Sequence, residues 1–285
     1  MSMLVFGATG QVATELQRRA PLARYLSRDQ ADLSDPDACA ALIRQAAPSA
    51  IINAAAYTAV DAAEADEPLA LRINGDAPAA MARAAAALDV PFVHISTDYV
   101  FDGSGTLPRH PEEGPAPCNA YGRTKLAGER GIAAAGGRFA ILRTSWVVSA
   151  HGRNFLKTML TLSETRDSLR IVDDQIGGPT PAGAIAAACL TIAEELARSP
   201  DKAGTYHFSG TPDTSWKGFA QAIFAAAGRD VAVHGIPTRD YPTPAARPLN
   251  SRLDCSATER AFGIARPDWR AALPDIIADV GKDGP

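Results

Sequence analysis

The chain has 285 residues, of which 46% are hydrophobic, 21% are charged and 6% are aromatic, and this composition excludes a disordered or fibrous protein. Its 28 Lys and Arg residues face 32 Asp and Glu residues, so the formal net charge is −4, and no basic block offers the positive field that nucleic acids require. No run of about 18 apolar residues predicts a membrane span, and the first residues lack the charged and long apolar regions of a secretory signal. We therefore expect a cytoplasmic protein with neither nucleic-acid nor membrane partners.

The cysteines and histidines are scattered along the chain. The four cysteines lack the Cys-x-x-Cys spacing, and the five histidines lack the i, i+4 spacing, of metal sites. We expect reduced, structural thiols and structural roles for the histidines.

Strands and helices alternate in the first half of the chain. Apolar runs predict strands over 3–6, 24–27, 50–53, 91–96 and 138–143. Helical patterns cover about 11–19, 67–88 and 121–134, and Ser34-Asp35-Pro36 predicts the start of another helix. Such alternation predicts an α/β fold with a Rossmann-type, doubly wound parallel sheet that binds ligands at the carboxyl ends of its strands.

The alternation weakens after about residue 146, where glycine and proline interrupt the pattern, as in Gly177-Gly178-Pro179-Thr180-Pro181. We expect residues 1–146 to form one domain, to which some later segments return. Residues 147–285 are expected to form mainly a smaller lobe of loops and short helices.

A glycine turn, Gly7-Ala8-Thr9-Gly10-Gln11-Val12-Ala13, joins the first predicted strand to the first helix. Its G-x-x-G-x-x-A spacing permits a tight turn and close backbone approach, and the helix N-terminus offers free N–H groups to a pyrophosphate. Elsewhere in a chain the motif would indicate only a structural turn, but after the first strand it predicts a dinucleotide site. The predicted contacts are Gly7, Thr9, Gly10, Gln11 and Val12.

The end of the second strand indicates which nicotinamide cofactor binds. Ser27-Arg28 stands where an acid would favour NADH, and an arginine there favours the 2′-phosphate of NADPH. NADH stays open as the alternative, because Arg28 could equally be a solvated surface charge. Asp32 and Leu33 are expected to cover the adenine, with an exposed loop carboxylate as the alternative for Asp32.

Tyr121 and Lys125 stand four residues apart at the start of a predicted helix, and so lie on one face of it. A nearby cation favours the phenolate, so the pair could donate and recover the proton that reduction of a carbonyl by hydride requires. Ser96-Thr97-Asp98 ends the preceding strand, from which a hydroxyl could reach the same carbonyl.

With these motifs the chain resembles the extended short-chain dehydrogenase/reductases and, within them, the dTDP-4-dehydrorhamnose reductases. The resemblance covers nearly the whole chain through seven blocks in the family order, at 7–12, 53–64, 96–103, 121–129, 143–147, 174–180 and 241–248 with 250–251. It implies that 1–146 is an NAD(P)-binding domain and that 147–285 mainly binds substrate. The implied reaction is hydride transfer from NAD(P)H to dTDP-4-dehydro-β-L-rhamnose, giving dTDP-β-L-rhamnose in the last step of its synthesis.

The resemblance also assigns roles to residues. Tyr121 would donate the proton, Lys125 would hold the nicotinamide ribose and lower the Tyr121 pKa, and Thr97 would orient the keto oxygen. Asn74 would support the lysine, or else be a plain amide on a helix surface. Further cofactor contacts would come from Ile95, Ala56, Tyr57 and Thr58. The substrate pocket would include Val60, Thr97, Asp98, Tyr99, Phe101, Tyr121, Trp146, Asn154 and Arg247, with core packing between lobes as the alternative for Trp146 and a diphosphate as the partner of Arg247.

Some members of this family are metal-bridged dimers held through surface glutamates. Glu15 is compatible with such a site, but residues 179–184 contain no acid to serve as a second ligand. We expect no structural metal and favour a monomer over a homodimer. Two other interpretations stay open: a nucleotide-sugar epimerase or dehydratase of the same superfamily, and a non-catalytic NADP-binding subunit like the regulatory subunit of methionine adenosyltransferase.

Overall fold

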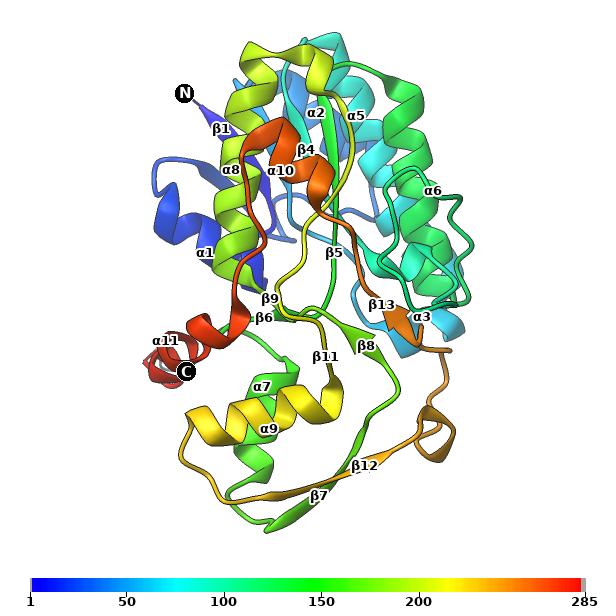
Figure 1. Ribbon diagram of the computed structural model, residues 1–285. Helices are drawn as coiled ribbons and strands as arrows, with labels where there is room; N and C mark the ends of the chain where they lie inside the picture. Colours follow the sequence, from blue (N-terminus) through cyan, green and yellow to red (C-terminus); the bar gives the residue numbers. More distant parts are fainter. Residues whose placement is uncertain (1, 283–285) are drawn as a thin grey trace.

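A six-stranded parallel sheet forms the centre of the protein (Figure 1). The computed structural model describes residues 2–282, so Met1 and 283–285, the outer ends of the two expected regions, lie outside the described residues. The strand order is β10-β5-β4-β3-β1-β2, with every neighbouring pair parallel. The strands are β1 (Met3–Phe6), β2 (Arg24–Leu26), β3 (Ala50–Asn53), β4 (Phe92–Thr97), β5 (Phe139–Thr144) and β10 (Gly204–His207).

Helices cover both faces of this sheet, which confirms the doubly wound α/β fold. Leu4 and Phe6 of β1 join the apolar cluster beneath α2 (Pro36–Ala46) and α5 (Ala77–Ala87). Val5, between them, joins the opposite cluster beneath α1 (Gln11–Arg19) and α8 (Ala182–Arg198). Successive side chains of a strand point to opposite faces, so an uninterrupted apolar run suits a strand that is buried on both sides.

The helical stretch expected over about 67–88 is present, and a π-helical turn interrupts it. The chain forms α3 (Val60–Ala65), α4 (Glu67–Leu71), a π-helical turn (Arg72–Asp76) and then α5. Asp66 caps α4 by accepting a hydrogen bond from the Leu69 amide, and Pro68 occupies its first turn. The π turn lies between two good helical segments, as π-bulges often do at functional sites.

Residues after 146 divide between the sheet and a second group of elements. The expectation of loops and short helices is wrong for α8, which has 17 residues and covers one sheet face, and β10 extends the sheet beside β5. The second group has its own apolar cluster, with Leu156, Phe219 and Trp269 fully or almost fully buried. Its elements include α7 (Phe155–Leu162), β7 (Ser168–Val172), α9 (Trp216–Ala226), β12 (Ala232–Ile236) and α11 (Trp269–Asp279).

Short elements connect these two parts. They are β6 (Val147–Val148), β8 (Ile176–Gly177), β9 (Thr180–Pro181), β11 (Thr214–Ser215) and β13 (Asn250–Ser251). The remaining elements are α6 (Ala120–Ala135), a 16-residue helix packed beside α5, α10 (Ser256–Phe262), and 3-10 turns at 98–100, 200–202 and 238–240. β8 pairs with both β11 and β13, and β6 pairs with β9, so the second group meets the sheet through small strand pairs.

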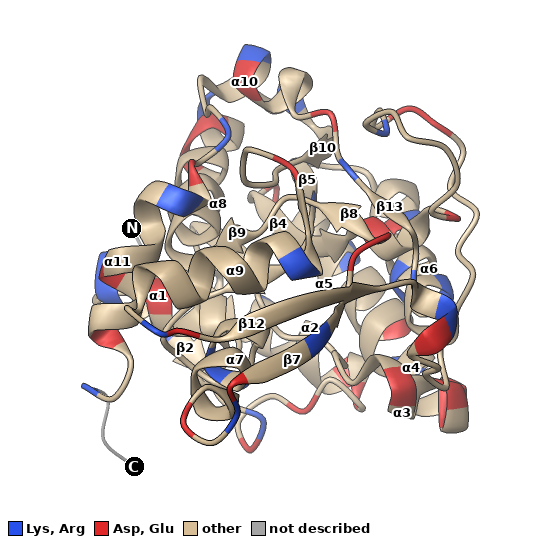
Figure 2. Ribbon diagram, turned by 60° about the horizontal axis from the view of Figure 1, so that its bottom comes forward, with Lys and Arg blue, Asp and Glu red and all other residues tan. Residues whose placement is uncertain are grey.

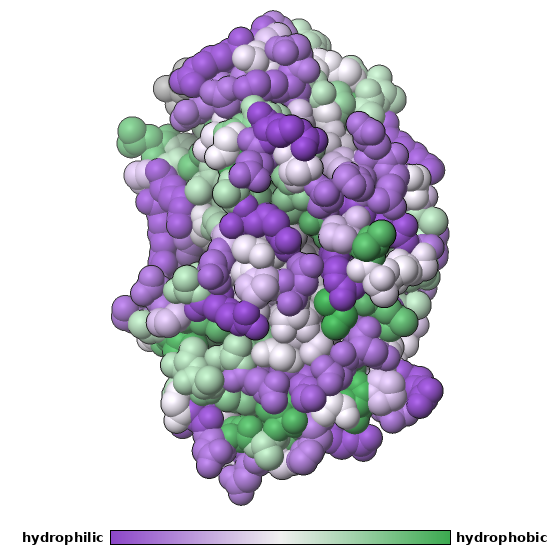
Figure 3. Space-filling model, viewed as in Figure 1, coloured by the Kyte–Doolittle hydropathy of each residue, from purple (hydrophilic) through white to green (hydrophobic). Residues whose placement is uncertain are grey.

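The surface mixes both signs of charge. Figure 2 shows Lys and Arg interspersed with Asp and Glu over the elements it displays. Figure 3 shows mainly hydrophilic residues on the viewed face, with smaller apolar patches toward the second group of elements. Within residues 2–282, no helix combines the length and apolar character needed to cross a membrane.

Candidate active site

The turn after β1 leaves the start of α1 open. Gly7 has φ +109°, and a Cβ there would lie 3.3 Å from the Ala54 carbonyl carbon, so the turn packs against the backbone after β3. A Cβ at Gly10 would have no neighbouring atom within 4 Å. Thr9 and Gly10 are exposed, whereas Val12 is buried in the core. The exposed backbone at the start of α1 therefore fits a pyrophosphate group.

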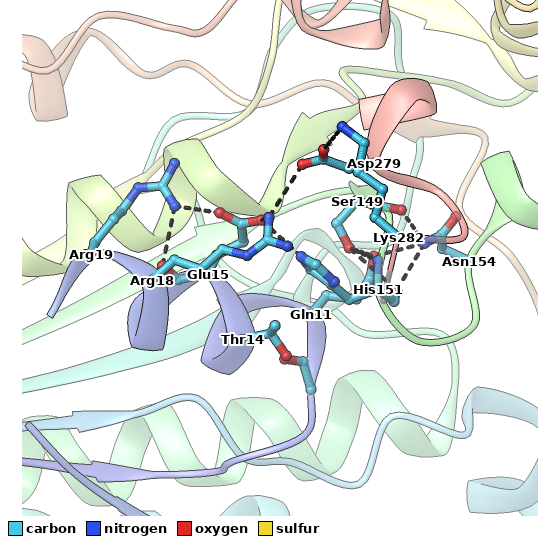
Figure 4. Close-up of polar contacts among 11 residues, drawn as sticks. Gln11, Thr14, Glu15, Arg18, Arg19, Ser149, His151, Asn154, Asp279 and Lys282 are labelled. Carbon is cyan, nitrogen blue, oxygen red and sulfur yellow. Dashed lines mark hydrogen bonds and ion pairs between the residues drawn. The ribbon is translucent and has the colours of Figure 1, made fainter. Parts of the chain in front are cut away.

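The Gln11 side chain turns away from this opening (Figure 4). Its Oε1 accepts hydrogen bonds from Ser149 Oγ at 2.8 Å and from Asn154 Nδ2 at 3.0 Å. Asn154 also donates to the Ser149 carbonyl and caps α7 through its Oδ1. The structure thus places the Asn154 amide in a link between α1 and α7, and we do not carry it into the proposed substrate site.

The same helix carries Glu15, the residue compatible with a metal site. Its carboxylate pairs with Arg19, and its Oε1 lies 3.0 Å from His151 Nε2 (Figure 4). Arg18 extends the network to Asp279 of α11 at 3.3 Å. Across residues 2–282, no three His, Cys, Asp or Glu side chains are grouped to hold a metal ion.

Arg28 is exposed two residues beyond β2. Asp32 accepts a hydrogen bond from the Ser34 amide at 2.9 Å, and that bond lowers the Asp32 pKa. Leu33 is buried at 6% exposure in the core beneath α2. Arg28 is therefore the member of this predicted group that offers a positive charge to a ligand.

We expect Arg28→Ala to raise KM for NADPH about tenfold and to leave KM for NADH unchanged, because the guanidinium would pair only with the extra phosphate. Initial rates with each cofactor measure this. A preference for NADH that the substitution leaves unaltered would contradict the assignment, and Arg44→Ala on α2 provides a control for loss of one positive charge.

Asn74 has a role that neither sequence interpretation foresaw. It is 1% exposed, so the surface-amide alternative is wrong. Its Oδ1 accepts from the Tyr57 amide at 2.8 Å, and its Nδ2 donates to the Tyr57 carbonyl at 3.1 Å and to Thr124 Oγ1 at 3.2 Å. Asn74 thus fixes the loop after β3 against α6. Ala56, Thr58 and Val60 belong to the same segment, which ends in α3.

Thr97 and Tyr121 come together at the carboxyl end of β4. The Thr97 hydroxyl lies close enough to the Tyr121 phenol to lower its pKa, and it donates to Asp98 Oδ1 at 3.2 Å and accepts from the Tyr99 amide at 3.2 Å. The rings of Tyr99 and Tyr121 meet edge to face, with centroids 5.6 Å apart. Asn119 caps α6 by accepting from the Gly122 amide at 2.8 Å, which fixes the start of the helix that carries Tyr121.

Lys125 is directed toward β4. Its Nζ donates to the Ile95 carbonyl at 2.8 Å and lies 3.0 Å from His94 Nε2, and the side chain is 1% exposed. Burial lowers the Lys125 pKa to about 8 and raises that of Tyr121 to about 12. The expectation that Lys125 lowers the Tyr121 pKa is therefore wrong for the ligand-free protein, where the Thr97 hydroxyl alone opposes the effect of burial.

Asp98 is a buried carboxyl group beside this pair. It is 3% exposed, its Oδ1 accepts from Thr97 Oγ1 at 3.2 Å, and its Oδ2 has no hydrogen-bond partner. Burial raises the Asp98 pKa to about 6, against the opposing effect of a hydrogen bond from Ser251. A buried carboxylate oxygen without a partner is costly, so this atom is available to a ligand donor.

This pKa predicts a pH effect on stability. The folded protein binds the Asp98 proton more tightly than the unfolded chain does, so this contribution is present below about pH 4 and is lost as the pH rises to about 6. We expect Asp98→Asn to gain roughly 2 kcal/mol of stability relative to wild type between pH 4 and pH 7. Urea unfolding at both pH values measures the difference, with exposed Asp37→Asn as a control. An equal effect of Asp98→Asn at the two pH values would contradict the shifted pKa.

The other predicted substrate residues differ in the exposure and the contacts of their side chains. Trp146 follows β5 with φ +47°, a left-handed conformation that is unusual for a bulky residue, and stacks on Trp216 with centroids 3.7 Å apart. Arg247 pairs with Asp61 at 2.8 Å and retains 18% side-chain exposure. Phe101 is 2% exposed and lies beneath the Arg143 guanidinium, 5.1 Å from its ring centre. Its ring belongs to the core, so we do not propose it as a substrate contact.

The chain is similar to known proteins over nearly its whole length. A family model described as the RmlD substrate binding domain matches residues 1–282. A protein of Sinorhizobium fredii named dTDP-4-dehydrorhamnose reductase is 45% identical over 295 residues, covering 99% of this chain and 100% of the relative. The chain belongs to the dTDP-4-dehydrorhamnose reductase family.

Solved structures of this family share the fold over almost the full length. A dTDP-4-dehydrorhamnose reductase of Clostridium acetobutylicum has a TM-score of 0.91 at 35% identity, covering 98% of this chain and 99% of that one. The Bacillus anthracis reductase in complex with NADP has a TM-score of 0.90 at 32% identity, covering 98% and 100%.

Proposed function

We propose that the protein is an NADPH-dependent reductase that converts dTDP-4-dehydro-β-L-rhamnose to dTDP-β-L-rhamnose, the last step of dTDP-rhamnose synthesis. The observation that carries the proposal is that the Thr97 hydroxyl and the Tyr121 phenol lie together at the carboxyl end of β4, beside a buried lysine. Full-length relatives that are named as this reductase support the choice of substrate.

When bound, the cofactor supplies a hydride, and the protein supplies the proton. Tyr121, with its pKa raised to about 12, keeps its proton at neutral pH and can donate it to a developing alkoxide. Thr97, beside the phenol, would orient the keto oxygen, and Asp98 Oδ2 offers an acceptor to a sugar hydroxyl. NADH is the alternative hydride source, since Arg28 is the sole basis in this chain for choosing the phosphate-bearing cofactor.

We further propose roles for the larger parts. Residues 1–146 with α8 and β10 hold the cofactor, and the second group of elements closes over the substrate. Trp146 would contact the sugar nucleotide, and Arg247 would reach its diphosphate while Asp61 holds the guanidinium. We favour a monomeric, cytoplasmic enzyme without a structural metal, and light scattering with and without a chelator tests the monomer.

A coupled assay tests the reaction. Purified protein receives NADPH and dTDP-4-dehydro-β-L-rhamnose generated in place by upstream enzymes, and dTDP-rhamnose is scored by chromatography together with the fall in absorbance at the NADPH wavelength. Stoichiometric NADPH consumption supports the reductase. Conversion of the keto sugar to a product other than dTDP-rhamnose, without net consumption of cofactor, would indicate an epimerase or dehydratase, and binding of NADP without any turnover would indicate a regulatory subunit.

A further inference from the structure

Behind Lys125 lies a buried row of three polar side chains. Asn53 and His94 are register partners on the neighbouring strands β3 and β4, and they are 1% and 0% exposed. Asn53 Nδ2 lies 3.1 Å from His94 Nδ1, and His94 Nε2 lies 3.0 Å from Lys125 Nζ. None of the sequence motifs drew attention to His94, whose only expected role was structural.

The direction of each hydrogen bond in this row follows from its first member. The Ala55 amide, which can only donate, lies 3.2 Å from Asn53 Oδ1, so the Asn53 NH₂ group faces His94. His94 Nδ1 must then accept. A neutral imidazole that accepts at one nitrogen carries its proton on the other, so the proton of His94 is on Nε2 and points at Lys125.

This arrangement favours one protonation state of the lysine. A neutral amine can accept the His94 Nε2–H with its lone pair while donating to the Ile95 carbonyl. An ammonium has no acceptor and would face the imidazole N–H, unless His94 moved its proton to Nδ1 and the Asn53 amide turned over. That rotation would break the bond from Ala55.

We propose that Asn53 and His94 are positioning residues for Lys125: they fix the imidazole proton on Nε2, aim it at Nζ and so disfavour the ammonium. Lys125 thereby becomes a group that exchanges a proton near neutral pH instead of remaining permanently charged. The lowering of its pKa to about 8 by burial acts in the same direction. The pKa of His94, lowered by burial and by Lys125, keeps the imidazole neutral.

Other charged groups around Lys125 do not reverse this effect. Glu129, one turn further along α6, favours the ammonium, but its carboxylate is held by two hydrogen bonds from Arg143 of β5. Tyr121, one turn before Lys125, keeps its proton because of its raised pKa. His94 is the polar group of β4 whose side chain contacts Nζ.

The test is the tautomer of His94, read by ¹⁵N NMR of the full-length protein labelled at histidine, without cofactor or substrate. We expect His94 to stay neutral between pH 6 and 9 and to carry its proton on Nε2 at pH 9, where Lys125 is mainly the free amine. His207 is an internal control in the same spectrum. Its Nδ1 lies 2.9 Å from the Arg109 carbonyl and its Nε2 lies 3.3 Å from Arg143 Nη1, so its proton must be on Nδ1. A His94 proton on Nδ1 at pH 9 would overturn the proposal.

Asn53→Asp supplies a matched variant of the same shape. A carboxylate accepts from His94 Nδ1–H, so the tautomer should reverse, and Nε2 should then accept from a Lys125 ammonium. An unchanged tautomer in the folded variant would also overturn the proposal. The wild-type spectrum decides the question even where the variant does not fold.

A kinetic consequence rests on the proposed reductase function. If turnover needs the Lys125 ammonium, the alkaline limb of the kcat profile lies near pH 8 in wild type, and Asn53→Asp should move it up by about one pH unit. His234→Gln, at an exposed position on β12, should leave the limb in place. A variant that shows the reversed tautomer but an unmoved limb would contradict the effect on Lys125. A protein without turnover, but with the expected tautomers, would contradict only the proposed function.

Discussion

Tyr121→Phe is expected to reduce kcat at least 100-fold while leaving the dissociation constant for NADPH within about twofold of wild type. The substitution removes only the hydroxyl that lies beside Thr97, and general acid catalysis of this kind contributes roughly 10²–10⁴ in rate. The ring that packs edge to face against Tyr99 is retained, so the fold should be unaffected. Turnover in the coupled assay and cofactor fluorescence titration measure the two quantities.

Tyr99→Phe is the matched control for this loss. It deletes a phenolic hydroxyl from the other member of the same ring pair, and burial also raises the pKa of that phenol. Because Tyr99 contacts Thr97 through its backbone amide, its side chain is not required to hold the Thr97 hydroxyl. We expect Tyr99→Phe to change KM more than kcat. Near wild-type turnover by Tyr121→Phe would remove Tyr121 from the role of proton donor.

The period of apolar residues predicts the strands of the first half well, for a physical reason. The strands β1, β3, β4 and β5 are buried on both faces of a doubly wound sheet, so each is a short, mainly apolar run bounded by turn residues. The edge strand β2 is partly exposed. The helical stretch at 67–88 is also predicted, but nothing in the apolar period marks its π turn, Arg72–Asp76, which contains no alanine. The return of β10 to the sheet depends on pairing with β5, far away in the chain, which local patterns do not report.

Spacing along the chain likewise brings out some site residues and hides others. Tyr121 and Lys125 are four residues apart on one helix, so a short sequence motif identifies them. His94 lies 31 residues from Lys125 and 41 from Asn53, inside an apolar strand. The sheet register brings it beside Asn53, and the packing of α6 against β4 brings Lys125 to it. The burial of Phe101 and the ion pair between Arg247 and Asp61 also depend on tertiary contacts. The family motif therefore assigned Phe101 to the substrate pocket although its ring is buried, and it did not indicate Asp61 as a partner of Arg247.

The ion pair between Glu129 and Arg143 is expected to be the most important polar contact for stability near the site. Both side chains are about 95% buried, and Arg143 Nε and Nη2 reach the carboxylate at 3.0 and 2.7 Å. Ser96 Oγ donates to the same carboxylate at 2.5 Å, and Arg143 Nη1 donates to the Pro111 carbonyl at 3.2 Å. The pair thus joins β4, β5 and α6 to the loop that follows Phe101.

Glu129→Gln should therefore lower the free energy of unfolding by about 3–5 kcal/mol, because it leaves the Arg143 guanidinium buried without a counter-charge. The matched surface pair is Arg123 with Glu67, whose side chains are 44% and 40% exposed, and Glu67→Gln should cost less than about 1 kcal/mol. Urea unfolding of both variants against wild type measures the contrast. Removing both partners with Glu129→Gln and Arg143→Met should recover part of the loss, since an uncompensated buried charge costs more than an absent pair. Equal losses in the two single variants would show that water reaches Arg143 in solution.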